Sequence, residues 1–260
     1  MSARLNASLI VLGLIIVLTI NALANILPIN GYNTGQISAL YPNYFVPAGF
    51  TFSIWAVIYL LLIGFVICSL FAAFGKFNEA AKTSINKTGP YFLATCLLNA
   101  GWILAWHYLY LGLSLVIMVA FLLILLRLYI VIRPMKSQMP FFYRLWAFHA
   151  FVVYLAWICV ATIANVTALL VGFGWQGEPL SPQIWSMIMI LVALVLGVFM
   201  VGKQKQPAFG FVLAWAFWGI YSAQSAESRM IAFTAGPSLS LIFSLTVTIL
   251  VKSKNKSMPG

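Results

Sequence analysis

The sequence predicts an all-α, polytopic membrane helical bundle. Of its 260 residues, 63% are hydrophobic and 7% are charged, whereas about 25% of the residues in a typical soluble domain are charged. A chain so poor in charge cannot cover a water-facing surface, and a membrane-spanning helix needs roughly 20 mostly apolar residues. The apolar runs are long and do not alternate with polar residues, so they indicate helices rather than the strands of a barrel.

Apolar stretches separated by turn signals predict about eight transmembrane helices. Several begin with a proline, because the missing amide donor costs nothing in a first helical turn. These prolines are Pro47, Pro90, Pro140, Pro182 and Pro207. In the last stretch, Gly236-Pro237 should kink or break the helix. The expected spans are residues 8–28, 49–73, 90–109, 111–133, 143–172, 183–202, 207–224 and 231–251.

The distribution of Lys and Arg predicts the orientation in the membrane, because cytoplasmic loops carry an excess of both. Of the 14 basic residues, only Arg229 falls on the opposite side. The others are Arg4, Lys76, Lys82, Lys87, Arg127, Arg133, Lys136, Arg144, Lys203, Lys205, Lys252, Lys254 and Lys256. Both termini are therefore expected in the cytoplasm, with residues 252–260 as a basic tail, and residues 29–48 as an outward loop. The expected location is the cell (inner) membrane.

The N-terminal stretch has a second interpretation. Arg4, the apolar run from Leu9 to Ile20 and the Ala22-Leu23-Ala24 triplet together resemble a signal peptide with its cleavage site. The apolar character continues to Pro28, which favours a membrane span. The sequence does not decide whether residues 1–24 are removed.

Several chemistries lack the residues they need. The three acidic residues are all Glu: Glu79 falls in a cytoplasmic loop, and Glu178 and Glu227 near the outer surface. No carboxylate is therefore expected inside the membrane to couple transport to protons or sodium. The net charge of +11 is scattered between apolar runs, which excludes a nucleic-acid surface. The three cysteines lie within apolar runs, so neither a disulfide framework nor a metal site is expected.

The two histidines are expected on opposite sides of the bilayer. His107 falls near the outer end of its span and His149 near the cytoplasmic end of another, so the two cannot ligate one iron. A hydrogen-bonded or packing role is favoured over that of a single axial ligand.

Tryptophan is abundant, with nine copies. Trp146, Trp175 and Trp185 fit an interfacial belt of amphipathic rings, and Trp106 is a weaker candidate for it. The others lie deeper in their spans, where helix packing or a ligand pocket must explain them. These are Trp55, Trp102, Trp157, Trp215 and Trp218.

Aromatic and polar residues repeat on one face of two spans. The third span carries Asn99, Trp102 and Trp106, and the fifth carries Tyr154, Trp157, Ala161 and Asn165. Steps of three or four residues keep each set on one helix face. Trp55 lies about two turns below the outer surface on the second span, and Tyr59 one turn deeper. We expect all nine residues to line a common ligand-binding interior; helix–helix packing alone is the alternative.

At these residues the sequence resembles the TspO/MBR family, the tryptophan-rich sensory and translocator proteins. The segments that carry the likeness are Pro47–Tyr59, Leu98-Asn99-Ala100-Gly101-Trp102, and Tyr154-Leu155-Ala156-Trp157 followed by Ala161-Thr162 and Asn165. Their order and approximate spacing agree with the family over roughly residues 5–172. Three positions depart from its pattern: Ala48 replaces a proline, Phe50 replaces a tryptophan, and an acid is missing near Ile117.

The resemblance implies a five-helix bundle, residues 1–173, with an intramembrane pocket for porphyrins, haem or sterols beneath the first loop. By the family's pattern the pocket would be lined by Trp55, Asn99, Trp102, Trp157 and Ala161. The resemblance does not explain three additional helices in residues 174–251. One triplet there, Leu213-Ala214-Trp215, echoes Leu155-Ala156-Trp157.

The sequence therefore predicts a membrane receptor or carrier for a flat hydrophobic ligand, either a tetrapyrrole such as protoporphyrin or haem, or a sterol-like lipid. The expected partners are membrane lipid and this ligand, with no resident cofactor, no metal and no nucleic acid. A homodimer is left open. The alternative function is secondary transport of a small neutral solute. No nucleophile–base pair is present, and an enzyme, such as one for light-dependent porphyrin breakdown, is allowed only by the resemblance.

Overall fold

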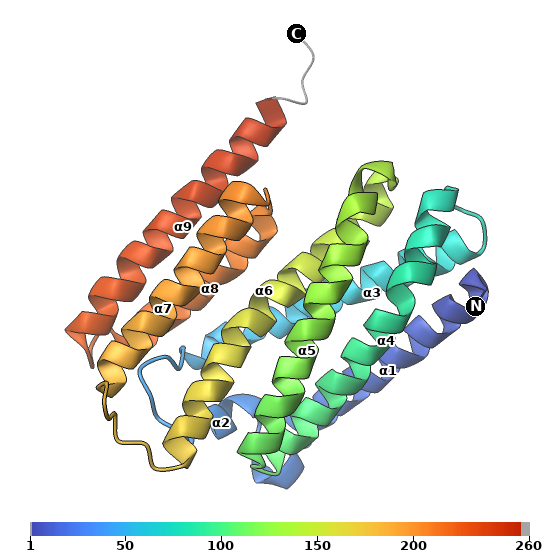
Figure 1. Cartoon of the computed structure of the whole chain (residues 1–260). Helices are drawn as coiled ribbons and strands as arrows, with labels where there is room; N and C mark the ends of the chain where they lie inside the picture. The colour runs from blue at the N-terminus through green and yellow to red at the C-terminus, as the bar shows by residue number, and fades with distance from the viewer. Residues whose placement is uncertain (1, 256–260) are drawn as a thin grey trace. The chain divides into compact units, whose positions relative to one another are not determined.

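The computed structural model describes residues 2–255, which form helices and no strand (Figure 1). The long helices are α1 (Ala3–Ile26), α3 (Ile54–Ala73), α4 (Glu79–His107), α5 (Leu111–Ile132), α6 (Phe141–Gly172), α7 (Pro182–Val198), α8 (Pro207–Gln224) and α9 (Arg229–Asn255). The short elements are η1 (Ile29–Gly31), α2 (Thr34–Ala39), η2 (Gly49–Ser53), η3 (Arg133–Gln138) and the π-helical turn η4 (Phe199–Lys203).

The all-α membrane fold predicted from the sequence is confirmed. In the described part of the chain, six helical segments are long and apolar enough to cross a membrane. They are Ala3–Ile26, Gly49–Ala73, Leu111–Gln138, Phe141–Gly172, Pro182–Lys203 and Arg229–Ser253. The other two predicted spans form α4 and α8, which are helical but less apolar. The protein is a multi-pass integral membrane protein.

The helices belong to two compact units. Unit 1 contains Met1–Ile37 and Trp55–Ile158, and unit 2 contains Ser38–Ile54 and Cys159–Gly260. The division therefore falls within α6, whereas the sequence analysis placed a boundary after residue 173. The segment Ser38–Ile54, which includes residues 38–48 of the predicted outer loop, groups with the C-terminal helices.

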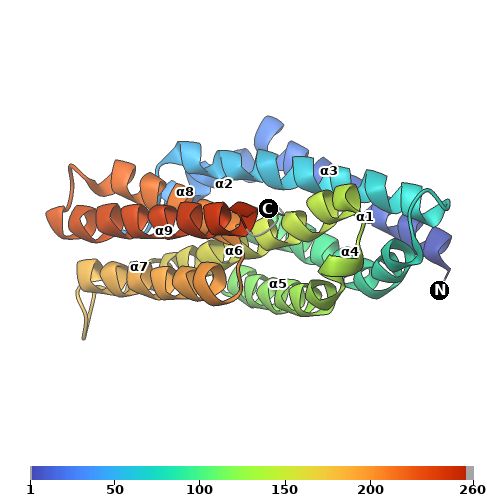
Figure 2. The same cartoon turned by 90° about the horizontal axis from the view of Figure 1, so that it is seen from above.

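In unit 1, α4 lies alongside α1 and α5 in both views (Figures 1 and 2). Near the N-terminal end of α1, Asn6 Nδ2 donates a hydrogen bond to Asn86 Oδ1 at 2.9 Å. Deeper in the unit, Phe65 of α3 contacts Phe92 of α4 and Phe151 of α6, with ring centroids 5.2 and 4.8 Å apart. Edge-to-face ring contacts thus join three helices at the centre of this unit.

In unit 2, α7, α8 and α9 pack alongside one another (Figure 2). Two glycines of α8 permit close approach by their neighbours: Gly210 lies against Thr246 of α9, and Gly219 against Thr51. The Ala48 amide donates to the Gly219 carbonyl oxygen at 3.0 Å. Small residues at contacts are the usual means of close packing between membrane helices, and here they also fix the segment before α3 against α8.

The predicted start of the third span was wrong. Helix α4 begins at Glu79 rather than near Pro90, because the Asn78 side chain caps it by accepting from the Ala81 amide at 3.1 Å. Pro90 therefore lies inside the helix.

The sequence also predicted a kink or break at Gly236-Pro237; α9 continues through Pro237 to Asn255, so the helix is not broken there. Ser and Thr side chains and neighbouring helices commonly accommodate a proline in a membrane helix. Just after Pro237, Ser238 Oγ donates to the Thr234 carbonyl at 2.7 Å and Ser240 Oγ to the Gly236 carbonyl at 3.2 Å. Most of the predicted basic tail, including Lys256, lies outside the described residues.

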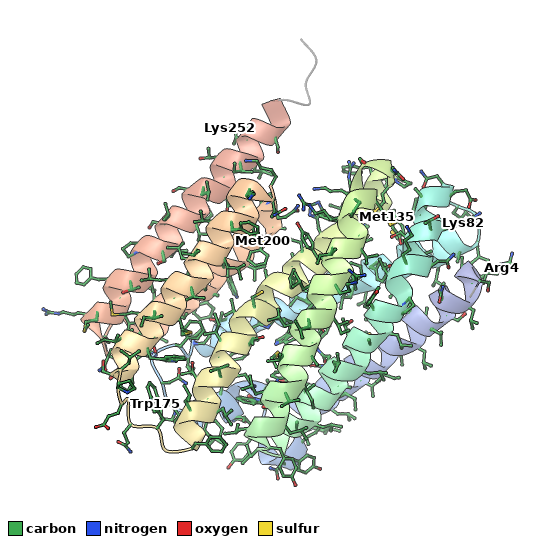
Figure 3. All side chains as sticks on the ribbon, in the orientation of Figure 1. Arg4, Lys82, Met135, Trp175, Met200 and Lys252 are labelled. Atoms are coloured by element: carbon green, nitrogen blue, oxygen red, sulfur yellow. The ribbon has the colours of Figure 1, made fainter. Side chains whose placement is uncertain are left out.

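Charged and aromatic residues mark the ends of each unit. Figure 3 shows Arg4 and Lys82 at the same end of unit 1, and Lys252 and Trp175 at opposite ends of unit 2. Within each unit, this placement agrees with the prediction from the sequence that most basic residues lie at the same end of the spans. The cytoplasmic location of both termini remains a prediction.

Replacing Gly64 tests the packing of α3 against α6 in unit 1. A Cβ at Gly64 would fall among the ring atoms of Trp146, so Gly64→Ala should lower the stability by about 1–3 kcal/mol, as overpacking does. Thermal unfolding in detergent measures the change. In the matched control Gly112→Ala, nothing lies within 4 Å of the new methyl group. That variant should be as stable as the parent or slightly more stable, and equal midpoints for the two variants would contradict the packing described.

Candidate ligand-binding site

Three helices of unit 1 bring their indole rings together. Trp55, in the first turn of α3, stacks on Trp102 of α4, with ring centroids 6.2 Å apart and planes 27° from parallel. Trp157 of α6 meets Trp55 nearly at right angles, at 6.3 Å and 83°. The sequence predicted that these residues share an interior, and the structure places them in direct ring contact.

The cluster extends along both flanks. Trp106 continues the stack beyond Trp102, at 6.1 Å and 19°, and Tyr59 stacks on Trp55 at 5.6 Å and 22°. Tyr154 presents its edge to Trp55 at 5.9 Å and 80°. Stacked and edge-to-face pairs of this kind each stabilise by about 0.5–1.5 kcal/mol beyond their buried area. The result is a row of nearly parallel rings with two perpendicular rings beside it.

Burial differs within the cluster. Trp102, Trp106 and Trp157 are 6%, 5% and 3% exposed, whereas Trp55 is only half-buried. Trp55 is therefore the most exposed of the four indoles in the cluster.

A chain of amide hydrogen bonds supports the rings. Asn21 of α1 donates through Nδ2 to Asn99 Oδ1 at 2.7 Å, and Asn99 Nδ2 donates to the Tyr154 hydroxyl at 2.9 Å. Asn99 and Tyr154 are almost completely buried. The Asn99 oxygen, predicted as a ligand contact, thus already accepts a hydrogen bond from the protein, and the chain of bonds links α1, α4 and α6.

Sequence reasoning missed Asn21. Its signal was present, because an amide inside an apolar helix has a desolvation cost and needs a partner. Asn21 lies in the first span, where no aromatic stripe accompanies it, so nothing in the sequence paired it with Asn99.

Trp102 offers a different polar group. Its indole nitrogen is buried and has no hydrogen-bond partner in the structure. The rings on both sides, Trp55 and Trp106, lie nearly parallel to it, so its N–H bond, which lies in the ring plane, does not point at their faces. An indole N–H can only donate, and this one remains available to an acceptor.

His107 anchors the segment that follows α1 to the end of α4. Its Nδ1 lies 3.1 Å from the Ile29 carbonyl oxygen and its Nε2 lies 3.2 Å from Thr34 Oγ1. Because a carbonyl can only accept, Nδ1 carries the proton, and Nε2 of the neutral ring accepts from the Thr34 hydroxyl. Trp106 Nε1 also donates to the Thr34 carbonyl, at 3.3 Å. The hydrogen-bonded role favoured for His107 is confirmed, and the described residues contain no group of side chains suited to a metal.

The last two predicted site residues lie further along α6. Ala161 is half-buried and Asn165 is 3% exposed. Both belong to the part of α6 assigned to unit 2, whereas Trp157 belongs to unit 1. The structure therefore groups seven of the nine predicted residues in one unit.

Comparison with known proteins supplies independent information. Residues 7–250 match the family model described as TSPO-like protein. The matched range includes the last three helices, which the resemblance noted in the sequence had left unexplained. Neither the curated proteins nor the solved structures give a match.

Removing the Asn21 side chain tests the amide chain. Asn21→Ala leaves the buried Asn99 oxygen without its donor, and the expected loss is about 0.5–2 kcal/mol, between the values for membrane and soluble proteins. Asn25→Ala is the matched control, because Asn25 donates only to the Asn21 carbonyl of its own helix. Thermal unfolding and the emission maximum of the tryptophans should change for Asn21→Ala alone. Unchanged values for both variants would show that these bonds do not hold the cluster.

Proposed function

The chain belongs to the TSPO-like protein family, and we propose that it is a membrane receptor or carrier for a flat hydrophobic ligand. The ligand class is a tetrapyrrole, such as protoporphyrin or haem, or a sterol-like lipid. The observation that carries this proposal is the contact of Trp55, Trp102 and Trp157, contributed by three different helices. Mutual packing of membrane helices does not by itself call for large rings, since small residues are the usual contacts.

The geometry of the rings suggests how a flat molecule would bind. The indoles already lie about 6 Å from one another, so no ligand fits between them as they stand. A macrocycle or fused ring system would pack against the part of Trp55 that the neighbouring rings leave exposed. Trp102 and Trp157 both contact Trp55 and would hold its ring in place.

Hydrogen bonding would orient the ligand. The Trp102 N–H is a donor without a partner, while the Asn99 oxygen and one of its N–H groups are occupied. A ligand that enters this cluster therefore gains most if it presents an acceptor to Trp102. An imine-type ring nitrogen of a metal-free porphyrin, a carboxylate oxygen and a sterol hydroxyl oxygen all meet this requirement.

Charge separates the candidate ligands. With the predicted orientation, Arg229 is the one basic residue expected on the outer side. The propionate groups of a porphyrin would therefore have few basic side chains to pair with there. A neutral ring lipid has no such need. This balance favours the sterol-like class over a dianionic porphyrin.

Secondary transport has less support. A broken helix at Gly236-Pro237 was the feature that pointed to it, and α9 is continuous there. Saturable flux of a neutral solute into liposomes, unaffected by porphyrin, would favour transport over our proposal.

Quenching of tryptophan fluorescence by protoporphyrin, with the protein in phosphatidylcholine vesicles, tests ligand binding at the cluster. Trp157→Phe and Trp102→Phe should each weaken binding about 3–10-fold, because the loss of one indole contact or donor corresponds to roughly 0.7–1.4 kcal/mol. Trp102→Phe keeps a ring at that position and so reports mainly on the N–H group.

Trp175→Phe is the control, because that indole donates to the Glu178 carbonyl in a loop of unit 2. It should leave the affinity unchanged. Unaltered affinity in both cluster variants, or an equal loss in the Trp175 control, would place the binding site elsewhere.

A further inference from the structure

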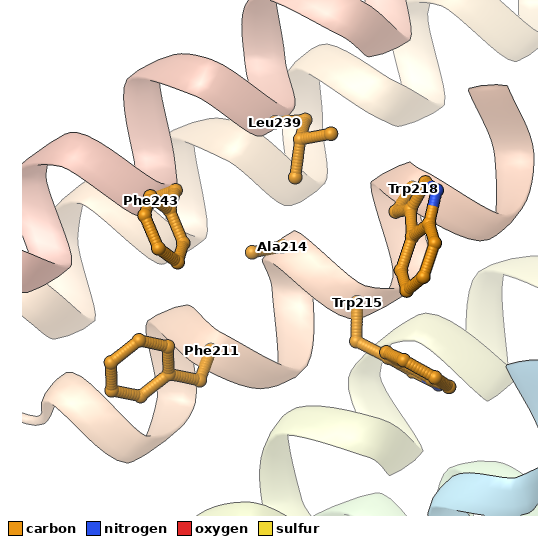
Figure 4. A pocket seen from close by; sticks show the side chains of 6 residues that line it. All are labelled: Phe211, Ala214, Trp215, Trp218, Leu239 and Phe243. Atoms are coloured by element: carbon orange, nitrogen blue, oxygen red, sulfur yellow. The ribbon is translucent and has the colours of Figure 1, made fainter.

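We propose that a pocket between α8 and α9 is a second ligand site, which takes the flat, uncharged ring system of a polycyclic lipid from the bilayer. The pocket has a volume of about 400 Å³, within the range of roughly 300–1,000 Å³ of small-molecule sites. It lies entirely in unit 2 and shares no residue with the cluster of unit 1. Its lining residues are Phe211, Ala214, Trp215, Trp218, Leu239 and Phe243 (Figure 4).

The sequence of α8 creates the hollow. The four lining residues of this helix follow one another at i, i+3, i+4 and i+7, so they lie on one face. Ala214 is the small one among three rings, and Figure 4 shows it between Phe211 and Trp215, with Leu239 of α9 opposite. Ala214 is 5% exposed, whereas Phe211 and Trp218 are 40% and 47% exposed. The pocket thus has a buried floor and an accessible aromatic rim.

The aromatic walls hold their orientation without a ligand. Trp215 Nε1 donates to the Thr51 carbonyl at 2.9 Å, which fixes that indole. Trp218 stands nearly perpendicular to it, at 5.2 Å and 80°. Phe50 contacts both indoles, with centroids 5.4 Å from Trp215 and 5.1 Å from Trp218. A site whose walls are already ordered loses little freedom on binding, which favours affinity.

The depth of the pocket separates it from an interfacial belt. Ala214 lies near the middle of α8 (Pro207–Gln224), and Phe243 near the middle of α9 (Arg229–Asn255). Belt tryptophans lie at the ends of membrane spans. At the depth of these residues, the exposed rings meet lipid chains rather than water, so a molecule reaches the pocket from within the bilayer.

The lining selects the chemistry of the occupant. It contains no charged side chain, and the N–H of Trp215 is already used. An anionic group in the pocket would be desolvated without a charged partner, and a cation would find only the faces of aromatic rings. A rigid ring system can pack on both indoles with little loss of conformational freedom, whereas an acyl chain must freeze many bonds to do so. The pocket therefore favours fused rings over a fatty chain.

A photoreactive sterol tests the proposal on the full-length protein in phosphatidylcholine vesicles, with the labelled peptides identified by mass spectrometry. Labelling should concentrate on α8 and α9 and be competed by unlabelled sterol. Ala214→Leu fills the floor and should reduce that labelling at least ten-fold. Trp218→Ala removes an exposed wall, with little risk to folding, and should also reduce it. Ala22→Leu makes the same change as Ala214→Leu at an exposed position of α1 and should have no effect.

Three outcomes would overturn the proposal. Labelling spread evenly over exposed helix faces, unchanged by Ala214→Leu, would show that the pocket is not selective. Equal labelling and competition by a photoreactive acyl-chain phospholipid would make it an ordinary lipid contact. A cross-link between two copies through Trp218 would make it a dimer interface. Protoporphyrin quenching in the Ala214→Leu protein should match the parent, so a failure here leaves the function proposed for unit 1 separately testable.

Discussion

The hydrogen-bonded pair of Asn21 and Asn99 is the constraint on which the arrangement of unit 1 depends. An amide placed among apolar helices must find partners within the protein, because lipid supplies none. Asn99 finds them on two sides, accepting from Asn21 of α1 and donating to the Tyr154 hydroxyl of α6. A rotation of α4 about its axis would break both bonds, so the direction of each face of this helix is fixed. Trp102 lies three residues after Asn99, and Trp157 three residues after Tyr154, and each therefore shares the face of its polar neighbour.

This constraint divides the roles within the cluster. The amides hold three helices in register. The rings supply an apolar surface, and its orientation is set by the helix faces that the amides fix. Trp55 joins from the first turn of α3, where it stacks on Trp102 and remains half-buried. The segment that follows α1 is held by His107, which bonds to Ile29 and Thr34. In unit 2, a hydrogen bond and a ring contact likewise hold an indole in place: Trp215 donates to the Thr51 carbonyl and packs with Phe50.

Local sequence signals predicted the helices and the faces that carry the site, but not all of the partners. Hydropathy located all eight long helices, and steps of three and four residues placed Asn99 with Trp102 and Tyr154 with Trp157. Proline predicted helix ends poorly. Helix α4 begins at the Asn78 cap and includes Pro90, and α9 accommodates Pro237 without ending. Asn21 and Asn99 lie in different helices and far apart in the sequence, so the periodicity within one helix cannot predict that they pair. The packing of Phe50 against Trp215 and Trp218 was hidden for the same reason.

An experimental structure of the protein with protoporphyrin bound tests most directly whether the cluster of unit 1 is a ligand site. We expect a macrocycle packed against Trp55, with one of its acceptor atoms within hydrogen-bonding distance of Trp102 Nε1, and the bonds between Asn21, Asn99 and Tyr154 intact. A porphyrin bound elsewhere, with Trp55 covered by protein side chains and the Trp102 nitrogen still without a partner, would contradict it.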